Sequence, residues 1–154
     1  MRNPFPIEEN IKKLILFWFC LSFVLASISY AADSVSSKTL WTGNKSAQFA
    51  FTNLSDGTGE SVVQKIDIST LPGSPTAIVI NKAWFAVNGM AVQVIFDHAT
   101  DDLVLTLAGT GYYDFAQIGG LKDPSAGTST GDLLFTTQGH SGTDTYSVVL
   151  DIGY

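Results

Sequence analysis

The fold is decided by residues 77–97, which read Ala-Ile-Val-Ile-Asn-Lys-Ala-Trp-Phe-Ala-Val-Asn-Gly-Met-Ala-Val-Gln-Val-Ile-Phe-Asp. Two runs rich in β-branched and aromatic residues meet at Asn88-Gly89, a dipeptide that tolerates the positive φ angles of a type I′ turn. The sequence therefore predicts a two-residue β-hairpin. In its register Phe85 faces Val92 on an apolar face, and the opposite face, which carries Trp84, is mixed.

The remaining strands are predicted from short alternating segments separated by Gly, Pro, Asn and Asp. They lie at residues 47–53, 62–69, 103–108, 112–116, 132–137 and 145–152. Gly109-Thr110-Gly111 is expected to end one strand before the next begins, and residues 119–131 form the longest loop. Within residues 62–69, Ile66 is expected to face the core and Lys65 to face solvent. No helical periodicity separates these segments, so we expect one all-β domain, an antiparallel β-sandwich or jelly roll of about eight strands.

A hydrophobic leader helix is expected to precede this domain. Basic residues come before residues 14–28, an uncharged apolar run of 15 residues, and Ser29-Tyr30-Ala31 follows it. This order is typical of a secretory signal peptide, and the run is short for a membrane span of about 20 residues. The alternatives are an uncleaved membrane anchor or an upstream extension from a misassigned start codon. Cleavage would leave a secreted or periplasmic protein.

The chain is thus divided into a leader (1–31), an extended polar arm (32–46) and the β-sandwich domain (47–154). The arm is rich in serine, and its few apolar residues include Leu40 and Trp41. We expect it to be mobile in the isolated domain and able to add to the sheet edge of a neighbouring molecule.

Charge and cysteine content exclude several functions. Residues 32–154 contain five lysines, eleven aspartates and one glutamate, and no arginine, which gives a net charge of −7. Nucleic-acid binders need clustered Lys and Arg, so we expect no nucleic-acid partner. The only cysteine, Cys20, lies in the leader, so the domain has no disulfide and no thiol nucleophile.

The best metal candidate is the turn that contains Asp97, His98, Asp101 and Asp102. Its carboxylates suit a hard cation, but their spacing is not that of a calcium loop. We expect a solvated turn whose Asp side chains accept hydrogen bonds from nearby backbone N–H groups. His98 and His140 are expected at the surface, because no third zinc ligand and no nucleophile motif accompany them. We therefore predict no catalytic residue, no metal, no cofactor and no enzymatic activity.

Four aromatic residues are candidates for contact with a ligand or a partner: Trp41, Trp84, Tyr112 and Tyr113. They could form a platform on which sugar rings stack, although aromatic residues in strands more often pack across the sheet. Trp84 is the strongest of the four, because it lies on the mixed face of its strand.

Four segments carry a resemblance to a known family: residues 32–40, 51–67, 87–92 and 130–140. On these segments residues 33–152 resemble small β-rich virion structural proteins of marine-type tailed bacteriophages, which are capsid-associated or decoration-like. The resemblance implies a location in the virion, contacts with capsid protein or with further copies of the chain in a homo-oligomer, and no enzymatic activity. The leader departs from that family, whose members begin near Ala32. The alternative is an exported β-sandwich binding module, with carbohydrate as a candidate ligand and membrane contact only through an uncleaved leader.

Overall fold

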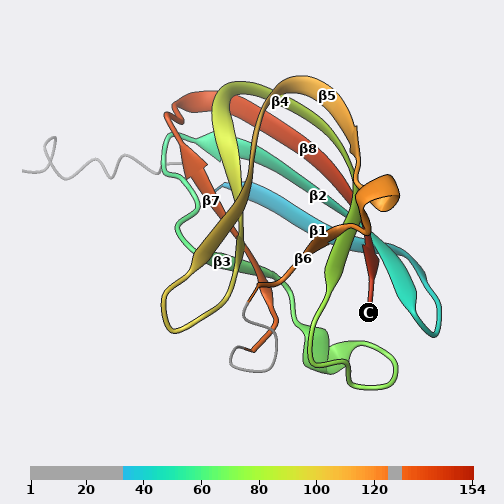
Figure 1. Cartoon of the computed structure of the whole chain (residues 1–154). Helices are drawn as coiled ribbons and strands as arrows, with labels where there is room; N and C mark the ends of the chain where they lie inside the picture. The colour runs from blue at the N-terminus through green and yellow to red at the C-terminus, as the bar shows by residue number, and fades with distance from the viewer. Residues whose placement is uncertain (1–32, 125–129) are drawn as a thin grey trace, which may run out of the picture. The chain divides into compact units, whose positions relative to one another are not determined.

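The computed structural model describes residues 33–124 and 130–154 (Figure 1). The predicted leader and part of the predicted long loop lie outside the described residues. The described chain is all-β, as predicted, and its eight strands form one antiparallel sheet that nearly closes on itself. The strands are β1 (Ser34–Thr42), β2 (Ser46–Asp56), β3 (Val63–Ile66), β4 (Val79–Phe96), β5 (Asp102–Asp114), β6 (Leu121–Lys122), β7 (Leu133–Gln138) and β8 (Gly142–Gly153). Two 3₁₀ turns, η1 (Ile68–Thr70) and η2 (Ala116–Ile118), follow β3 and β5. In the described ranges no helix is long and apolar enough to cross a membrane.

The sheet folds over to form the two layers of a sandwich, and strand β4 belongs to both layers. Its first half pairs with β8 and with the second half of β5, and its second half pairs with β7 and with the first half of β5. Together β4 and β5 arch over the top of the molecule (Figure 1). One layer therefore contains β1, β2, β8 and the first half of β4, and the other contains β3, β7 and the second half of β4.

The predicted hairpin at Asn88-Gly89 is wrong, because β4 continues through these residues. The pairing of β4 with β5 steps from Val87 opposite Gly109 to Val92 opposite Leu107, so residues 88–91 form a bulge against a single residue of β5. Gly89 has a φ of +79°, which allows the strand to turn at that point. The true hairpin connects β4 to β5 through residues 97–101.

The prediction of which β4 side chains face the core is still correct at Phe85 and Val92. Phe85 and Val92 are both buried, although they lie an odd number of positions apart in the strand. A two-residue hairpin and a bulge both change which alternate residues point inward. Burial therefore agrees with the prediction while the topology differs.

The predicted break at Gly109-Thr110-Gly111 is also wrong. Strand β5 runs unbroken from Asp102 to Asp114 and bends beside the bulge of β4. Gly109 adopts a φ of +70° at this bend. Glycine here bends the strand without ending it, because Gly109 still pairs with Val87 and the pairing with β4 resumes at Leu107 opposite Val92.

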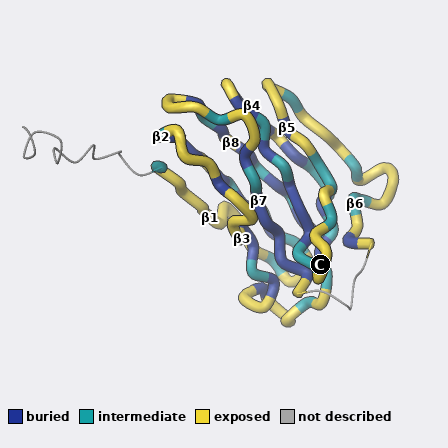
Figure 2. The backbone as a smooth tube through the Cα atoms, turned by 90° about the vertical axis from the view of Figure 1, so that its left-hand side faces the viewer, coloured by how far each residue is buried: buried dark blue, intermediate teal, exposed yellow. Residues whose placement is uncertain are grey.

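The core lies between the two layers and is built from alternate residues of each strand (Figure 2). On β8 the predicted inward residues are all buried: Tyr146, Val148, Leu150 and Ile152. On β2 Phe49 and Phe51 are also buried on one face, as predicted. These two strands are neighbours in the same layer.

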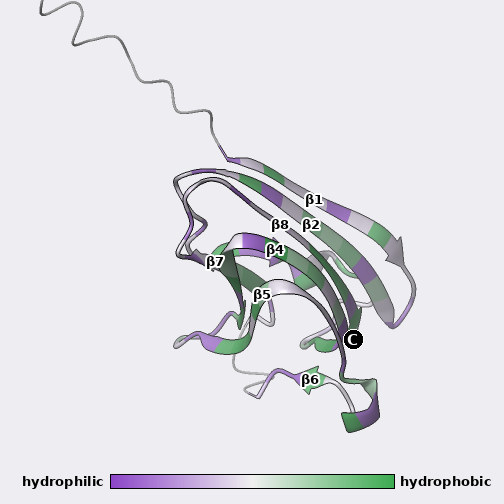
Figure 3. Cartoon of the chain, turned by 90° about the horizontal axis from the view of Figure 1, so that it is seen from above, coloured by the Kyte–Doolittle hydropathy of each residue, from purple (hydrophilic) through white to green (hydrophobic). Residues whose placement is uncertain are grey.

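The predicted arm is partly wrong. Residues 34–42 are extended and exposed, as expected, but they form β1, which is paired with β2 along its length and is not free. Figure 3 shows β1 at the outer edge of the layer beside β2. Asp33 also connects the start of β1 to β2, because its carboxylate accepts hydrogen bonds from the backbone N–H of Asp56 and the side chain of Asn53. The nine residues of β1 are all exposed, so this strand contributes no buried residue to the core.

Candidate functional site

The strongest candidate site lies on the outer face of β4, β5 and β8. Trp84 of β4 is paired with Tyr112 of β5 on one side and with Val149 of β8 on the other. Residues directly opposite in a sheet share a face, so these three side chains point away from the core. Phe85, the next residue of β4, points inward and is buried.

Trp84 and Tyr112 form a stacked pair. Their ring centroids are 5.2 Å apart with an interplanar angle of 28°, a geometry in the favourable range for aromatic pairs. Trp84 remains 37% exposed and Tyr112 47% exposed. Two large rings are therefore fixed by each other and still open to solvent.

An open depression of about 310 Å³ borders Trp84. The outward side chains that line it are those of Trp84, Ala86, Thr110, Ser147 and Val149. Apart from the indole these side chains are small, because the sequence places Ala, Ser, Thr and Val at alternate positions of the three strands. The indole ring therefore rises beside a shallow floor that carries two hydroxyl groups.

A polar cluster closes one end of this face. The hydroxyl of Tyr112 donates a hydrogen bond of 2.9 Å to Oδ2 of Asp114, and Nζ of Lys82 lies 3.7 Å from the same oxygen. The backbone N–H of Ala116 donates to Oδ1 of Asp114 at 3.0 Å. This N–H and the Tyr112 hydroxyl hold the pKa of Asp114 below its ordinary value. Desolvation, and then the hydrogen bond to Asp114, raise the pKa of Tyr112.

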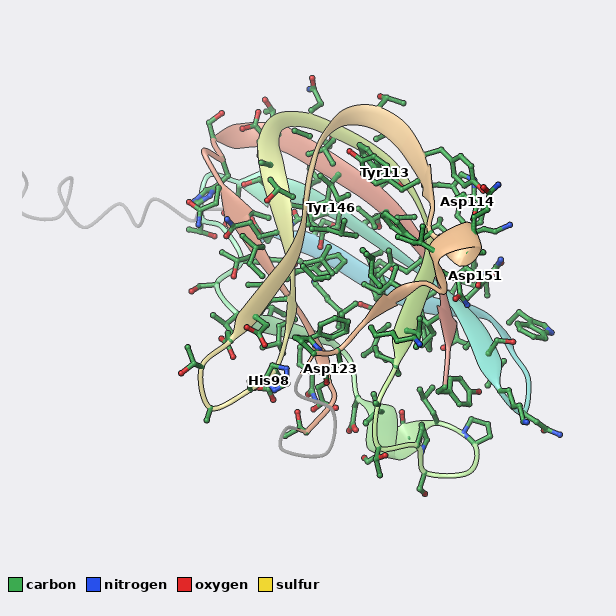
Figure 4. The ribbon with its side chains drawn as sticks, viewed as in Figure 1. His98, Tyr113, Asp114, Asp123, Tyr146 and Asp151 are labelled. Carbon is green, nitrogen blue, oxygen red and sulfur yellow. The ribbon has the colours of Figure 1, made fainter. Side chains whose placement is uncertain are left out.

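The other two aromatic candidates do not join this pair. Tyr113 lies on the opposite face of β5 from Tyr112, and its ring centroid is 5.2 Å from that of Phe85 and 5.6 Å from that of Phe115 (Figure 4). Trp41 is 53% exposed on β1, at the other edge of the layer. The predicted four-residue platform is therefore reduced to Trp84 and Tyr112.

The turn after β4 brings together residues that the sequence did not connect. Nε2 of His98 lies 2.8 Å from Oδ1 of Asp123 and 3.5 Å from Oδ2 of Asp102, and the His98 side chain is only 5% exposed (Figure 4). The prediction of a surface position for His98 is wrong, because Asp123, distant in sequence, covers it. Within the residues described, no hydroxyl side chain is hydrogen-bonded to His98, and its contact with Asp123 connects the turn after β4 to the segment after β6.

The Asp-rich turn itself has the predicted hydrogen bonding in part. The backbone N–H of His98 donates to Oδ1 of Asp101 at 3.3 Å. Asp97 instead accepts a hydrogen bond of 2.6 Å from the hydroxyl of Thr130. Across the described ranges, His, Cys, Asp and Glu side chains form no group of three or more that could hold a metal ion. His140 is half-buried and lies against Gly59.

A buried ion pair is the feature that the sequence prediction missed most clearly. Lys65, expected to face solvent, is buried with its Nζ atom 2.6 Å from Oε1 of Glu60. The hydroxyl of Tyr146 donates to Oε2 of Glu60 at 2.9 Å. Burial and the Glu60 carboxylate raise the pKa of Tyr146. The Lys65 ammonium also lies 5.6 Å from the ring centroid of Phe135, within range of a cation–π interaction.

Alternation along β4 and β5 could have identified the polar cluster. Lys82 and Trp84 are two residues apart, as are Tyr112 and Asp114, and such residues share a face of a strand. Asp123 and Glu60 carried no comparable sequence signal, since the partner of each depends on the path of a loop.

Comparison with models of known protein families gave no match, and comparison with curated proteins gave no relative.

Proposed function

We propose that this protein is a non-enzymatic structural component of a bacteriophage virion, associated with the capsid or the neck, which acts through protein–protein contacts. The resemblance of its turns and strands to marine-phage virion proteins is one support. The observation that carries the proposal is strand β1, which lies at the edge of the sheet with all nine residues exposed.

An exposed edge strand offers unpaired backbone N–H and C=O groups to another chain. β1 also exposes apolar side chains: Val35 by 43%, Leu40 by 49% and Trp41 by 53%. Lys38, at the centre of the strand, disfavours indiscriminate pairing, since lysine on an edge resists aggregation. A strand of this kind suits one specific protein partner.

The opposite end of the strand order offers a second contact surface. Strand β3 lies there, and its first residue, Val63, and the preceding Val62 are 38% and 47% exposed. A subunit that joins a closed or extended assembly needs contacts with neighbours on more than one side. Apolar residues at both ends of the strand order meet that need.

The test is co-sedimentation of the purified protein with particles of the phage that encodes it. In the test variant, serine replaces Val35, Leu40 and Trp41, and it should lose co-sedimentation while its melting temperature stays close to that of the parent. The matched control is Leu103→Ser, which removes an exposed leucine from β5 and should co-sediment like the parent. Full co-sedimentation of the test variant would contradict the proposed contact.

The alternative location is the periplasm or the medium, after cleavage of residues 1–31. N-terminal sequencing of protein from fractionated cells separates the two locations. Recovery of a processed chain that begins near residue 32 in the periplasm, with none in particles, would overturn the virion proposal in favour of an exported binding module.

A further inference from the structure

We infer that the outer face of β4, β5 and β8 binds a neutral pyranose ring of a β-linked polysaccharide, with Trp84 as the stacking surface. This inference does not rest on the virion role, and it applies equally to a secreted protein. It starts from the fixed pair of Trp84 and Tyr112, whose ring centroids are 5.2 Å apart.

The shape of the site suits one flat ring. Tyr112 supports the indole from β5, and the depression of about 310 Å³ borders the indole and is lined by residues of β4, β5 and β8. This volume is at the lower end of the range of about 300–1,000 Å³ for small-molecule sites. Small side chains on the floor, among them Ala86 and Ser147, leave room for a ring to lie against Trp84.

The chemistry of the lining matches both parts of a sugar. A pyranose with equatorial substituents presents C–H groups on its faces and hydroxyl groups around its rim. The indole offers an apolar, electron-rich face to the C–H groups. Thr110 and Ser147 supply hydroxyls in the depression, and the charged pair of Lys82 and Asp114 lies on the same face beyond Trp84 and Tyr112.

The negative charge of the domain favours neutral sugars over anionic ones as ligands. Residues 32–154 carry a net charge of −7, which disfavours binding of uronic acids and sulfated sugars. The ammonium group of Lys82, on the same outer face, lies 3.7 Å from the Asp114 carboxylate, which offsets its charge. β-1,4-linked glucose and N-acetylglucosamine are neutral and equatorially substituted, and they are the two probes that fit these requirements.

The experiment is native affinity electrophoresis of the full chain in gels that contain hydroxyethylcellulose or glycol chitin. The parent protein should be retarded by at least one polysaccharide relative to a gel without it. Trp84→Ala and Tyr112→Ala should lose the retardation, and Tyr112→Phe, which keeps the ring, should retain it. Trp41→Ala is the matched control, because it removes another exposed tryptophan, one that lies outside the depression, and should migrate like the parent.

Ala86→Arg tests the site independently of the aromatic variants, so that loss of binding can be separated from misfolding. It fills the floor of the depression from an exposed position and leaves Trp84 and Tyr112 in place, so retardation should be lost with little change in melting temperature. Retardation of the parent by neither polysaccharide would overturn the inference. So would equal losses in Trp41→Ala and Trp84→Ala, or unchanged binding in Ala86→Arg.

Discussion

The Nζ atom of Lys65 lies 2.6 Å from Oε1 of Glu60, and both side chains are almost fully buried. Tyr146 completes the arrangement by donating a hydrogen bond to the other carboxylate oxygen. A buried ion pair contributes little net stability compared with apolar residues, but loss of one partner leaves an uncompensated charge in the core. The pair therefore fixes how the segment before β3 packs against β8.

Removal of either partner alone should be strongly destabilising. We expect Lys65→Met and Glu60→Gln each to lower the free energy of unfolding by about 3–5 kcal/mol. The double variant should lose much less than the sum, because no charge is left unpaired. Urea unfolding of the four proteins measures this coupling, and additive losses would show that the two side chains do not interact.

Truncation of Phe85 should be costly because its side chain is buried between the layers. We expect Phe85→Ala to lower the free energy of unfolding by about 3–5 kcal/mol, as for other large-to-small core substitutions. Lys82→Ala, three residues earlier on the outer face, should change it by no more than about 0.5 kcal/mol. Comparable losses in thermal or urea unfolding would mean that the two faces of β4 are assigned wrongly.

The bulge of β4 predicts that substitution of Gly89 by alanine lowers the free energy of unfolding by more than the same substitution at a comparable glycine. A Cβ atom there would contact the Asp144 carboxylate, which accepts hydrogen bonds from the backbone N–H and the hydroxyl of Ser141. Gly73 is the control, because its φ of +82° is similar and a Cβ atom would meet nothing within 4 Å. Gly73→Ala should cost about 1–2 kcal/mol from the backbone angle alone. Gly89→Ala should cost clearly more in the same unfolding assay, and equal costs would contradict the close approach of Asp144 to Gly89.

The polar cluster beside Trp84 predicts a pH dependence. The pKa of Asp114 in the folded protein lies below its unfolded value of about 3.9, so its contribution to stability is present above that pH. The contribution is lost as the pH falls through the folded pKa. Carbon-detected NMR titration of the carboxyl groups should place the pKa of Asp114 below about 3.9. A value at or above the unfolded one would contradict the hydrogen bonds from Ala116 and Tyr112.

The pKa of Tyr112 is shifted upward, in contrast to that of Asp114. Its pKa lies above the ordinary value of 10.0, because desolvation and the Asp114 carboxylate disfavour the phenolate. The neutral form stabilises the fold below about pH 10, and this contribution is lost as the pH rises through the folded pKa. Asp114→Asn should move the pKa of Tyr112 back towards 10.0 in an NMR titration of the tyrosine ring. No movement would show that the hydrogen bond between them is absent.

The sequence predicted burial better than connectivity. Alternation along β2 and β8 identified Phe51 and Tyr146 as inward residues, because a strand has a strict period of two. At Asn88-Gly89 the same alternation fits both a hairpin and a bulge, so the local sequence could not decide the topology. The outcome depends on β7 and β8, which flank the two halves of β4 and lie far away in the chain.

The candidate site was predictable only in part. Trp84 was singled out because it lies on a mixed face, but its pairing with Tyr112 follows from the register of β4 with β5. That register is set by the bulge and by the turn after Phe96, neither of which the alternation defines. The buried contacts of Lys65 with Glu60 and of His98 with Asp123 depend on the paths of loops, for which sequence periodicity carries no information.

The proposed place of this chain in a virion can be tested by mass spectrometry of phage particles purified on a density gradient. Peptides from residues 33–154 should follow the particle peak and remain after a high-salt wash, at a copy number comparable to that of other structural proteins. Absence of these peptides from the particles, with the protein present in the soluble part of the same lysate, would contradict it.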